Sequence, residues 1–442
     1  MTTKYRIIPN LRHQQCLLIH PTTAKKLGIE YRKLTYLRFG VNCVEVKIIL
    51  SMEAAPGEVS LDNQIIENLK IPLFASYEIK IKPYEIVIGP YIGILVHKKE
   101  ETLDKNINVY SNYLYDYEAI GGVILAFSVE GIQMKCDKIR GYIFNPQTQK
   151  WEKGIYPYPA AVFKRTGMGK TMRNHIHRVI GDAIFNEYIL NKWETYDWLS
   201  NFAEIKPYLP DSRIYNNKGD LKIYLKLYNK VYIKPIDGSQ GIGIIEVVKD
   251  NEEFIVGYIK DGQTNKKQFT QENNMWDYIE SFLRKGKFIV QRGIDLVHTN
   301  GRKNDFRLLI IKNNKGIWED YGMIARYGVE GSIISNISGG GSAELGEVFL
   351  KNTLKLSEDR AYQLRKEIST IATRVGEAID ACGINCGNLG IDMGIDEKGN
   401  IWIIEVNNKD PNHTIALDAK DRQMFYGIKR ANMLYAKRLA GF

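Results

Sequence analysis

Long apolar segments are missing from this sequence of 442 residues: no run approaches the roughly 20 residues that a membrane-spanning helix needs. The first residues contain no apolar segment of the kind that a signal peptide carries. Cysteine is scarce as well. The five cysteines are scattered and form no CxxC pair, which argues against a disulfide framework and against a zinc site. We therefore expect a soluble, cytoplasmic protein without a membrane partner.

The charged residues give an excess of positive charge, with 61 basic and 51 acidic residues and a net charge of +10. Such an excess suits anionic partners, among them nucleotides, acidic polymers and nucleic acid. The lysines are spread along the chain, and there is neither an arginine-rich arm nor a recognisable nucleic-acid module. Nucleic acid is therefore not expected as a partner.

Length and composition predict a globular protein of two or three domains. Residues 1–88 alternate short β-like runs with turn signals, and a single short helix is predicted over Leu61–Leu69. From residue 89 to 184, apolar runs alternate with helix-like spacers. We expect a β-rich N-terminal domain over 1–88 and a small α/β domain over 89–184.

A glycine-rich tip between two β-type runs occupies the stretch from Val231 to Ile245. This arrangement differs from a Walker P-loop, in which GK[ST] opens a helix. Glycines let the backbone N–H groups approach a polyphosphate closely, and a lysine at the base of the tip adds a positive charge. The alternative is an ordinary hairpin that contains glycines. The candidate phosphate-binding residues are Lys234, Gly238, Ser239, Gln240, Gly241 and Gly243.

Near the end of the sequence, two further β-type runs flank a turn-forming cluster and predict a hairpin. Because alternate residues of a strand share a face, Glu405 and Asn407 point the same way. If Lys398-Gly399 form the tip, Asp392 lies directly opposite Glu405 on that face. A slip of one residue would move Asp392 to the other side of the sheet.

These three side chains suggest a metal site. Carboxylates within apolar runs are costly to bury unless they are paired or bound to a metal. Two carboxylates and an amide oxygen suit Mg²⁺, which completes its shell with water and phosphate oxygens, and Mn²⁺ is an alternative ion. The competing interpretation is a solvated hairpin face that carries acids by chance.

One long helix is predicted over Glu358–Cys382, before the metal hairpin. Ser357 is a good N-cap for it, its apolar residues recur as one stripe, and Gly383 closes it. We interpret this helix as structural.

The motifs resemble those of a known family. The pattern KPxxGSxGxG, followed some 170 residues later by a GxD…ExN hairpin, resembles the ATP-grasp superfamily. Between them, Asp305-Phe306-Arg307 and the segment 335–341 resemble the DxR and SNxxxGG segments of RimK-like ligases. The whole arrangement is similar to the YheC/YheD-type endospore-coat-associated ATP-grasp proteins.

This resemblance implies a mixed α+β and α/β fold. Residues 185–442 would form the ATP-grasp domain, in which two α+β lobes hold ATP between them. The region 89–184 would be the α/β domain that usually precedes it, and 1–88 the β-rich N-terminal domain. The cofactors implied are ATP and Mg²⁺.

The resemblance also implies roles for individual residues. Lys192 matches a first phosphate-contacting lysine, and the polar loop 408–413 matches a segment with substrate and phosphate contacts. The RimK-like loop carries an arginine that this chain lacks at 338–341, which puts recognition of the acceptor in doubt. The remaining implied contacts are an adenine-binding hinge at Gln291, Arg292 and Ile294, a ribose contact at Asp295, and catalytic groups at Arg307, Arg326 and Asn336.

The activity implied is that of an ATP-dependent carboxylate–amine ligase, which forms an amide or peptide bond through an acylphosphate, linked to formation of the spore coat or envelope. The alternatives are an ATP-grasp kinase and a nucleotide-binding structural coat protein without catalysis. The partners are then ATP, a carboxylate and an amine of unspecified identity, with a peptide or an anionic polymer as candidates, and spore-coat proteins. Association with the spore coat is the alternative to a purely cytoplasmic location.

Overall fold

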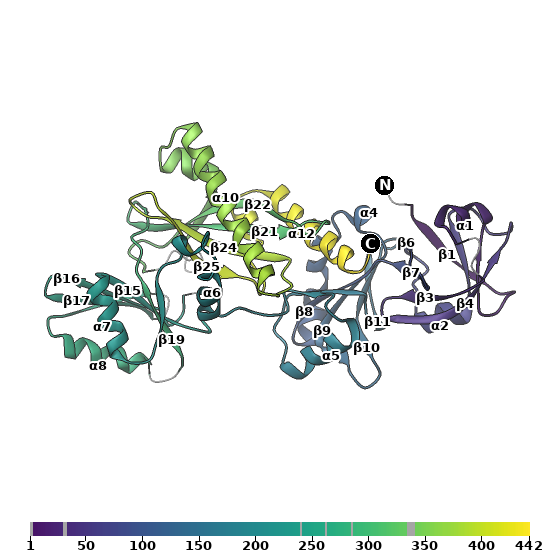
Figure 1. Ribbon diagram of the computed structural model, residues 1–442, viewed down its shortest axis with the longest axis horizontal. Coiled ribbons are helices and arrows are strands. Elements are labelled where there is room, and N and C mark those ends of the chain that lie inside the picture. The colour runs from purple at the N-terminus through teal and green to yellow at the C-terminus, as the bar shows by residue number, and fades with distance from the viewer. Residues whose placement is uncertain (1–2, 30–32, 239–240, 261–262, 284–285, 334–340) are drawn as a thin grey trace. The chain divides into compact units, whose positions relative to one another are not determined.

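A computed structural model of the chain describes all residues except 1–2, 30–32, 239–240, 261–262, 284–285 and 334–340 (Figure 1). The chain forms two compact units, each described here by itself. Unit 1 consists of Met1–Glu187, Lys312–Ile317 and Tyr426–Phe442, and unit 2 consists of Tyr188–Ile311 and Trp318–Phe425. The finer division of the chain into three domains at residues 88 and 184 stays a prediction.

Unit 1 begins with a closed barrel of seven strands in the order β1-β5-β2-β4-β3-β7-β6. Two similar halves build it, because β2-α1-β3-β4 and β5-α2-β6-β7 repeat the same order of elements. Each helix starts at a residue whose side chain accepts a backbone N–H, His20 or Asp62, and ends at a left-handed residue, Gly28 or Lys70. The bounds are β1 (Tyr5–Asn10), β2 (Cys16–Ile19), α1 (Pro21–Leu27), β3 (Leu34–Phe39), β4 (Asn42–Leu50), β5 (Glu58–Asp62), α2 (Asn63–Leu69), β6 (Ser76–Ile81) and β7 (Glu85–Gly89).

A sheet of six strands in the order β11-β10-β9-β8-β12-β13 forms the rest of unit 1. The strands β9, β8, β12 and β13 run parallel, and their apolar residues are buried on both faces, as parallel sheets require. The last helix, α12 (Arg422–Leu439), contributes Met433 and Tyr435 to the core of this sheet. The other bounds are β8 (Tyr91–His97), α3 (Glu100–Asn106), η1 (Ile107–Leu114), α4 (Tyr117–Ile120), β9 (Val123–Gln133), β10 (Lys138–Asn145), β11 (Lys150–Pro157), β12 (Ala161–Lys164), α5 (Lys170–Ile180) and β13 (Ile184–Phe185).

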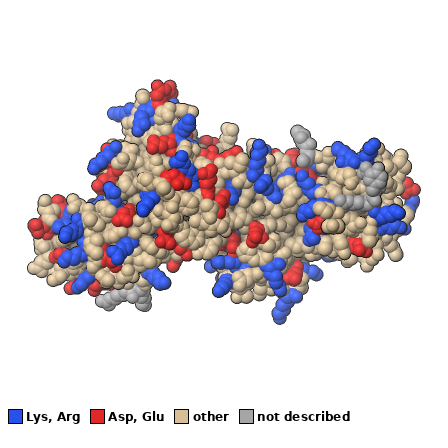
Figure 2. Space-filling model, in the orientation of Figure 1, with Lys and Arg blue, Asp and Glu red and all other residues tan. Residues whose placement is uncertain are grey.

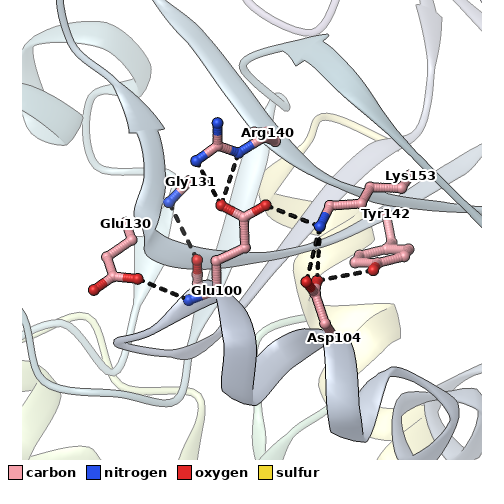
Figure 3. Close-up of polar contacts among 8 residues, drawn as sticks. Glu100, Asp104, Glu130, Gly131, Arg140, Tyr142 and Lys153 are labelled. Carbon is pink, nitrogen blue, oxygen red and sulfur yellow. Dashed lines mark hydrogen bonds and ion pairs between the residues drawn. The ribbon is translucent and has the colours of Figure 1, made fainter.

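A polar network fastens α3 to the antiparallel part of this sheet (Figure 3). The carboxylate of Glu100 accepts from Arg140 at 2.7 Å and lies 3.0 Å from the ammonium of Lys153. Asp104 accepts from Lys153 at 2.9 Å and from the hydroxyl of Tyr142 at 2.8 Å. The carboxylates of Glu100 and Asp104 both face cations, and that of Glu130 accepts the backbone N–H of Glu100 at 2.9 Å, so we interpret the network as structural.

Unit 2 contains two further sheets. The first is antiparallel, in the order β14-β19-β15-β16-β17-β18, and carries α7 and α8. Its strands β15, β16 and β17 are labelled in Figure 1. Its bounds are α6 (Lys192–Leu199), η2 (Lys206–Tyr208), β14 (Ser212–Tyr215), α7 (Lys218–Leu227), β15 (Lys230–Pro235), β16 (Ile245–Asp250), β17 (Glu253–Lys260), β18 (Gln263–Phe269), α8 (Glu272–Leu283) and β19 (Phe288–Arg292).

The second sheet of unit 2 has the order β23-β22-β21-β24-β25 and packs against the long helix α10 (Glu358–Ala381). The predicted stripe of this helix, from Ala361 to Ile379, is buried, and the side chain of Ser357 caps its first turn, which confirms the sequence analysis. The remaining bounds are β20 (His298–Thr299), β21 (Arg302–Lys312), β22 (Trp318–Tyr327), β23 (Ser342–Leu345), α9 (Gly346–Val348), η4 (Phe349–Thr353), β24 (Asn388–Ile395), β25 (Ile401–Asn407) and α11 (Ile415–Asp418).

Two properties of the whole chain bear on its partners. On the face shown in Figure 2, acidic side chains are interspersed among the basic ones over the described residues, so the net charge is not gathered into one field there. Among the helices of the described residues, none has both the length and the apolar content that a bilayer crossing requires.

Candidate nucleotide and metal site

A cavity of about 450 Å³ lies in unit 2 and is lined by residues of both sheets. Most of the site residues predicted from the sequence meet in its wall, although they come from segments up to 215 residues apart. The predicted residues that line it are Lys192, Lys234, Gly241, Gln291, Arg292, Ile294, Arg307, Arg326, Asp392, Glu405 and Asn407.

The other predicted site residues are not part of the described lining. Gly238 and Gly243 belong to the glycine tip beside it, and Gly243 has a φ of +77° that favours glycine. The carboxylate of Asp295 is mostly exposed and accepts a hydrogen bond from Lys230 at 3.0 Å. Ser239, Gln240 and Asn336 lie outside the described residues.

The hairpin of β24 and β25 has the pairing that the sequence analysis predicted, with Asp392 directly opposite Glu405. The structure reaches this pairing through a β-bulge and not, as predicted, through the position of the turn alone. Next to the turn, Ile395 pairs with Ile401, and that register alone would place Asp392 opposite Ile404. A β-bulge beside Asp392 takes up one extra residue of β25, and the pairing then continues with Glu405.

The first lysine of the site stands at the start of α6. Asn191 and Glu194 form a capping box there, which fixes the direction of the helix and of Lys192 in its first turn. The ammonium of Lys192 donates to the carbonyl of Gly238 and lies 3.6 Å from the carboxylate of Glu405. It therefore connects the glycine tip to the hairpin of β24 and β25.

The second lysine, Lys234, lies on β15 and is buried. Its ammonium donates to the side-chain oxygen of Gln291 at 2.5 Å. Burial disfavours the charged form and lowers the pKa of Lys234 to about 8, although Glu405 acts in the opposite direction. A buried ammonium with one neutral partner is well suited to receive an anionic ligand.

Four charged side chains form a chain of ion pairs at the wall of the cavity. Arg326 holds Asp305 with two hydrogen bonds of 2.6 Å, and it also lies 3.0 Å from Asp392. Arg307, directly opposite Asp392 on the neighbouring strand β21, binds the same carboxylate with two nitrogens. Burial by itself raises the pKa of Asp392, but the two guanidinium groups hold it below its ordinary value. Asp392 is therefore an ionised group with two cationic partners.

The sequence analysis missed a third lysine of the site, Lys303. Its ammonium donates to Glu246 at 2.9 Å and to the hydroxyl of Tyr232 at 2.9 Å, and both lysine and tyrosine line the cavity. Burial lowers the pKa of Lys303. A signal for it was present in the sequence, because Lys303, Asp305 and Arg307 are alternate residues of one strand and share a face.

The loop after β25 closes another side of the cavity. Its first residue, Asn408, is buried, accepts from the N–H of Leu190 at 3.2 Å and donates to the carbonyl of Tyr188 at 2.8 Å. At the other end, the ring of His413 is buried and bonded to Asn388 at 3.0 Å. The residues between these anchors that line the cavity are Asp410, Pro411 and Asn412. His413 thus acts as an anchor of the loop.

The hinge after β19 offers one backbone donor to a ligand. The N–H of Arg292 donates to the carbonyl of Asp211 at 2.8 Å, and that of Gly293 donates to Lys230 at 2.7 Å. The N–H of Ile294, which lines the cavity, has no partner among the residues that the structure describes. The N–H of Ile294 is therefore available to a ligand, and the role of this hinge in binding adenine stays a prediction.

The side chains of the hairpin fit a hard divalent cation by their chemistry. Asp392 and Glu405 supply carboxylates, and Asn407 supplies an amide whose buried nitrogen lacks a hydrogen-bond partner in the described part of the chain. Within the same residues, no group of three or more His, Cys, Asp or Glu side chains is placed to hold a metal without help. An ion at this site would thus need the amide and ligand oxygens as well.

Comparison with known proteins identifies the family of the chain. The family model described as YheC/D-like ATP-grasp matches residues 181–439. The chain is 25% identical over 440 residues to the endospore coat-associated protein YheD of Bacillus subtilis (strain 168), covering 96% of this chain and 93% of YheD. It is 20% identical over 314 residues to YheC of the same organism, covering 68% and 85%. Among solved structures, the VanG D-Ala:D-Ser ligase from Enterococcus faecalis aligns with a TM-score of 0.45 and 13% identity, covering 79% of this chain and 98% of that chain. With more than half of its length matched by the family model, the chain belongs to the YheC/D-like ATP-grasp family and has the ATP-grasp fold.

Proposed function

We propose that this protein is an ATP-dependent carboxylate–amine ligase that binds ATP in the cavity of unit 2. The observation that carries the proposal is the meeting of Lys192 and Lys234 with the hairpin side chains Asp392, Glu405 and Asn407 around one cavity. Two ammonium groups suit the phosphates, and the carboxylates and the amide suit a divalent cation that accompanies them.

Each wall of the cavity has a distinct task in this proposal. The N–H of Ile294 meets the base, while Ile244 and Leu296 supply apolar surface for it. The glycine tip and the lysines hold the phosphates. Asp392, Glu405 and Asn407 hold Mg²⁺, which, when bound, neutralises charge on the phosphate oxygens.

The reaction proceeds in two balanced steps. A carboxylate oxygen of the substrate attacks the γ-phosphorus, the bond to the β-phosphate breaks, and ADP leaves behind an acylphosphate. An amine nitrogen then attacks the acyl carbon, loses a proton and expels inorganic phosphate, which leaves an amide. Such chemistry depends on positioning and charge neutralisation and requires no covalent nucleophile of the protein. Arg307 and Arg326, as planar donors in the wall, suit the phosphate oxygens.

The substrates are proposed from the relatives. YheD and YheC are named endospore coat-associated proteins. We propose that the amide bond formed here serves the spore coat or envelope, with a peptide or an anionic polymer as the carboxylate or amine substrate and coat proteins as partners.

Nucleotide binding is the first test. Affinity for ATP would be measured with and without Mg²⁺ on the unaltered protein, on Glu405→Ala and on Glu397→Ala, an exposed acid of the same hairpin that does not line the cavity. We expect Mg²⁺-dependent binding by the unaltered protein and by Glu397→Ala, and a loss of roughly tenfold or more in Glu405→Ala. If the folded, unaltered protein does not bind ATP, a structural coat protein without catalysis is the better description.

Products separate a ligase from a kinase. A ligase releases ADP only when a carboxylate and an amine are both supplied and leaves an amide, whereas a kinase phosphorylates a single hydroxyl substrate. Mass spectrometry of the products with pairs of candidate substrates distinguishes the two.

A further inference from the structure

We propose that the ion pair of Arg307 and Asp392 keeps divalent metal out of the free protein, so that metal enters only together with the nucleotide and thereby releases Arg307. This inference rests on the proposed function, in which Asp392 holds the metal and Arg307 serves the reaction. These two roles conflict in the observed geometry, because the carboxylate of Asp392 pairs with Arg307 and would also have to bind the metal.

The geometry of Asp392 carries the first step. Arg307 binds both of its carboxylate oxygens, and Arg326 lies 3.0 Å from one of them. The carboxylate is buried, with 6% of its side chain exposed. Both carboxylate oxygens of Asp392 are thus engaged by guanidinium groups, and neither is open to solvent. A cation that binds Asp392 must therefore displace one of these groups.

The charge of the surrounding wall carries the second step. Among the residues that line the cavity, cations outnumber carboxylates by six to five: the cations are Lys192, Lys234, Arg292, Lys303, Arg307 and Arg326, and the carboxylates are Asp305, Asp392, Glu405, Asp410 and Asp418. A bare divalent cation would thus meet a wall that is already positive. The phosphates of a nucleotide reverse the sign of the local charge and supply further oxygen ligands, so they make metal binding favourable.

Of the two arginines that contact Asp392, Arg307 is the one that can release this carboxylate. Arg326 keeps two hydrogen bonds to Asp305 when Asp392 is engaged elsewhere, whereas no other carboxylate binds Arg307 among the described residues. In its observed position, the side chain of Arg307 lies against Gly390, which has no side chain. A Cβ there would lie 3.1 Å from Cδ of Arg307 and 3.3 Å from its Nη1. A released guanidinium stays in the cavity wall, where an anionic group of the substrate can bind it.

The test is binding of Mn²⁺ to the nucleotide-free protein, followed by electron paramagnetic resonance. The unaltered protein is compared with Arg307→Gln and with Arg292→Gln as a matched control. Arg292 lines the same cavity but lies over the rings of Tyr228 and Trp402 and does not pair with Asp392. We expect Mn²⁺ to bind Arg307→Gln about tenfold or more tighter than the unaltered protein, and Arg292→Gln to change the affinity by less than about threefold. Equal affinities of the unaltered protein and Arg307→Gln would overturn the inference.

A second measurement follows the side chain of Arg307 in the unaltered protein. The Nε–H signals of arginine, with that of Arg307 assigned through Arg307→Lys, are recorded by nuclear magnetic resonance. The Arg307 signal should persist with millimolar Mg²⁺ alone and change when ADP and Mg²⁺ are added together; a change with Mg²⁺ alone would contradict the inference. Failure of the proposed function itself looks different, because the protein would then bind no ADP in the second measurement, with or without Mg²⁺.

Discussion

At the scale of single residues, the site is defined by charges that are buried and paired. Asp305 and Asp392 would each be costly to bury alone, and the guanidinium groups of Arg326 and Arg307 offset that cost. Lys234 is different, since its ammonium donates to the neutral amide of Gln291. Because burial lowers the pKa of Lys234 to about 8, its charge responds to pH near neutrality.

The first prediction concerns the pH dependence of nucleotide binding. The pKa of Lys234 is about 8 in the free protein, and phosphates favour its charged form. Affinity for ADP should fall as the pH rises from 7 to 9, and binding at pH 8.5 should take up protons. Calorimetry in buffers of different ionisation enthalpy measures this uptake. Lys234→Met should abolish this proton uptake. Lys192→Met should weaken the binding of ADP but leave the proton uptake in place. Uptake that persists in Lys234→Met would refute the assignment.

The second prediction concerns stability and the same lysine. The unfolded chain holds the Lys234 proton up to about 10.5, whereas the folded free protein loses it near 8. Between these values the unfolded state binds more protons, so the contribution of Lys234 to the free energy of unfolding rises with pH. Urea unfolding at pH 7.5 and 9.5 should show this rise in the unaltered protein relative to Lys234→Met. If the free energies of unfolding of the unaltered protein and of Lys234→Met differ by the same amount at both pH values, the prediction is wrong.

At the scale of elements, the hairpin of β24 and β25 presents the side chains of the proposed metal site, and its neighbour β21 supplies the arginine opposite Asp392. The bulge in β25 and the anchored loop after it set where Glu405 and Pro411 lie. The close approach of these elements depends on Gly390. A Cβ there would lie 2.9 Å from Cβ of Pro411.

The third prediction is that Gly390→Ala destabilises the protein by about 1–3 kcal/mol, because the added methyl group forces Pro411 and Arg307 to move. Urea unfolding measures the loss, and affinity for nucleotide with Mg²⁺ should fall with it. The matched control is Gly167→Ala, since the φ of Gly167 lies outside the left-handed region and the added Cβ would meet only Cε of the flexible Lys98 side chain, at 3.8 Å. This control should stay within about 0.5 kcal/mol of the unaltered protein. An equal effect of both substitutions would show that Gly390 has no special role.

At the scale of the whole molecule, the chain leaves unit 1 at Glu187 and returns to it twice, at 312–317 and at 426–442. The last helix, α12, is tied to the barrel, because the ammonium of Lys437 donates to Glu78 of β6 and to the carbonyl of Ala119 at 2.9 Å. Both charged side chains are mostly buried, with 11% and 4% exposed. The stability of unit 1 therefore depends on the two ends of the sequence together.

The fourth prediction follows from this pair. Lys437→Met leaves the carboxylate of Glu78 buried without its cation and should lower the free energy of unfolding by about 3–5 kcal/mol. Adding Glu78→Gln to the same protein should restore part of the loss. The control is Lys105→Met, which breaks an exposed pair with Glu101 and should cost less than about 0.5 kcal/mol. Denaturation followed by circular dichroism measures the free energy of unfolding of the three variants and of the unaltered protein. Similar losses in Lys437→Met and Lys105→Met would refute the prediction.

The sequence by itself determined the features that depend on local pattern. The glycine tip, the buried stripe of α10 and the two alternating runs of the hairpin all follow from periodicity and turn chemistry. The pairing of Asp392 with Glu405 was predicted as well, but in the structure it depends on a bulge that was not foreseen. The motifs also placed the chain in its family.

Tertiary structure decided which groups surround those residues. Arg307 meets Asp392 because β21 pairs with β24, strands that lie about 85 residues apart, and Lys303 joins the site through Glu246 of the other sheet. The register between such distant strands is set by the packing of whole sheets, and no short pattern encodes it. For that reason the sequence could single out the acids of the hairpin and both arginines as candidate site residues, while the pairing of Arg307 and Arg326 with Asp392 became apparent only in the folded chain.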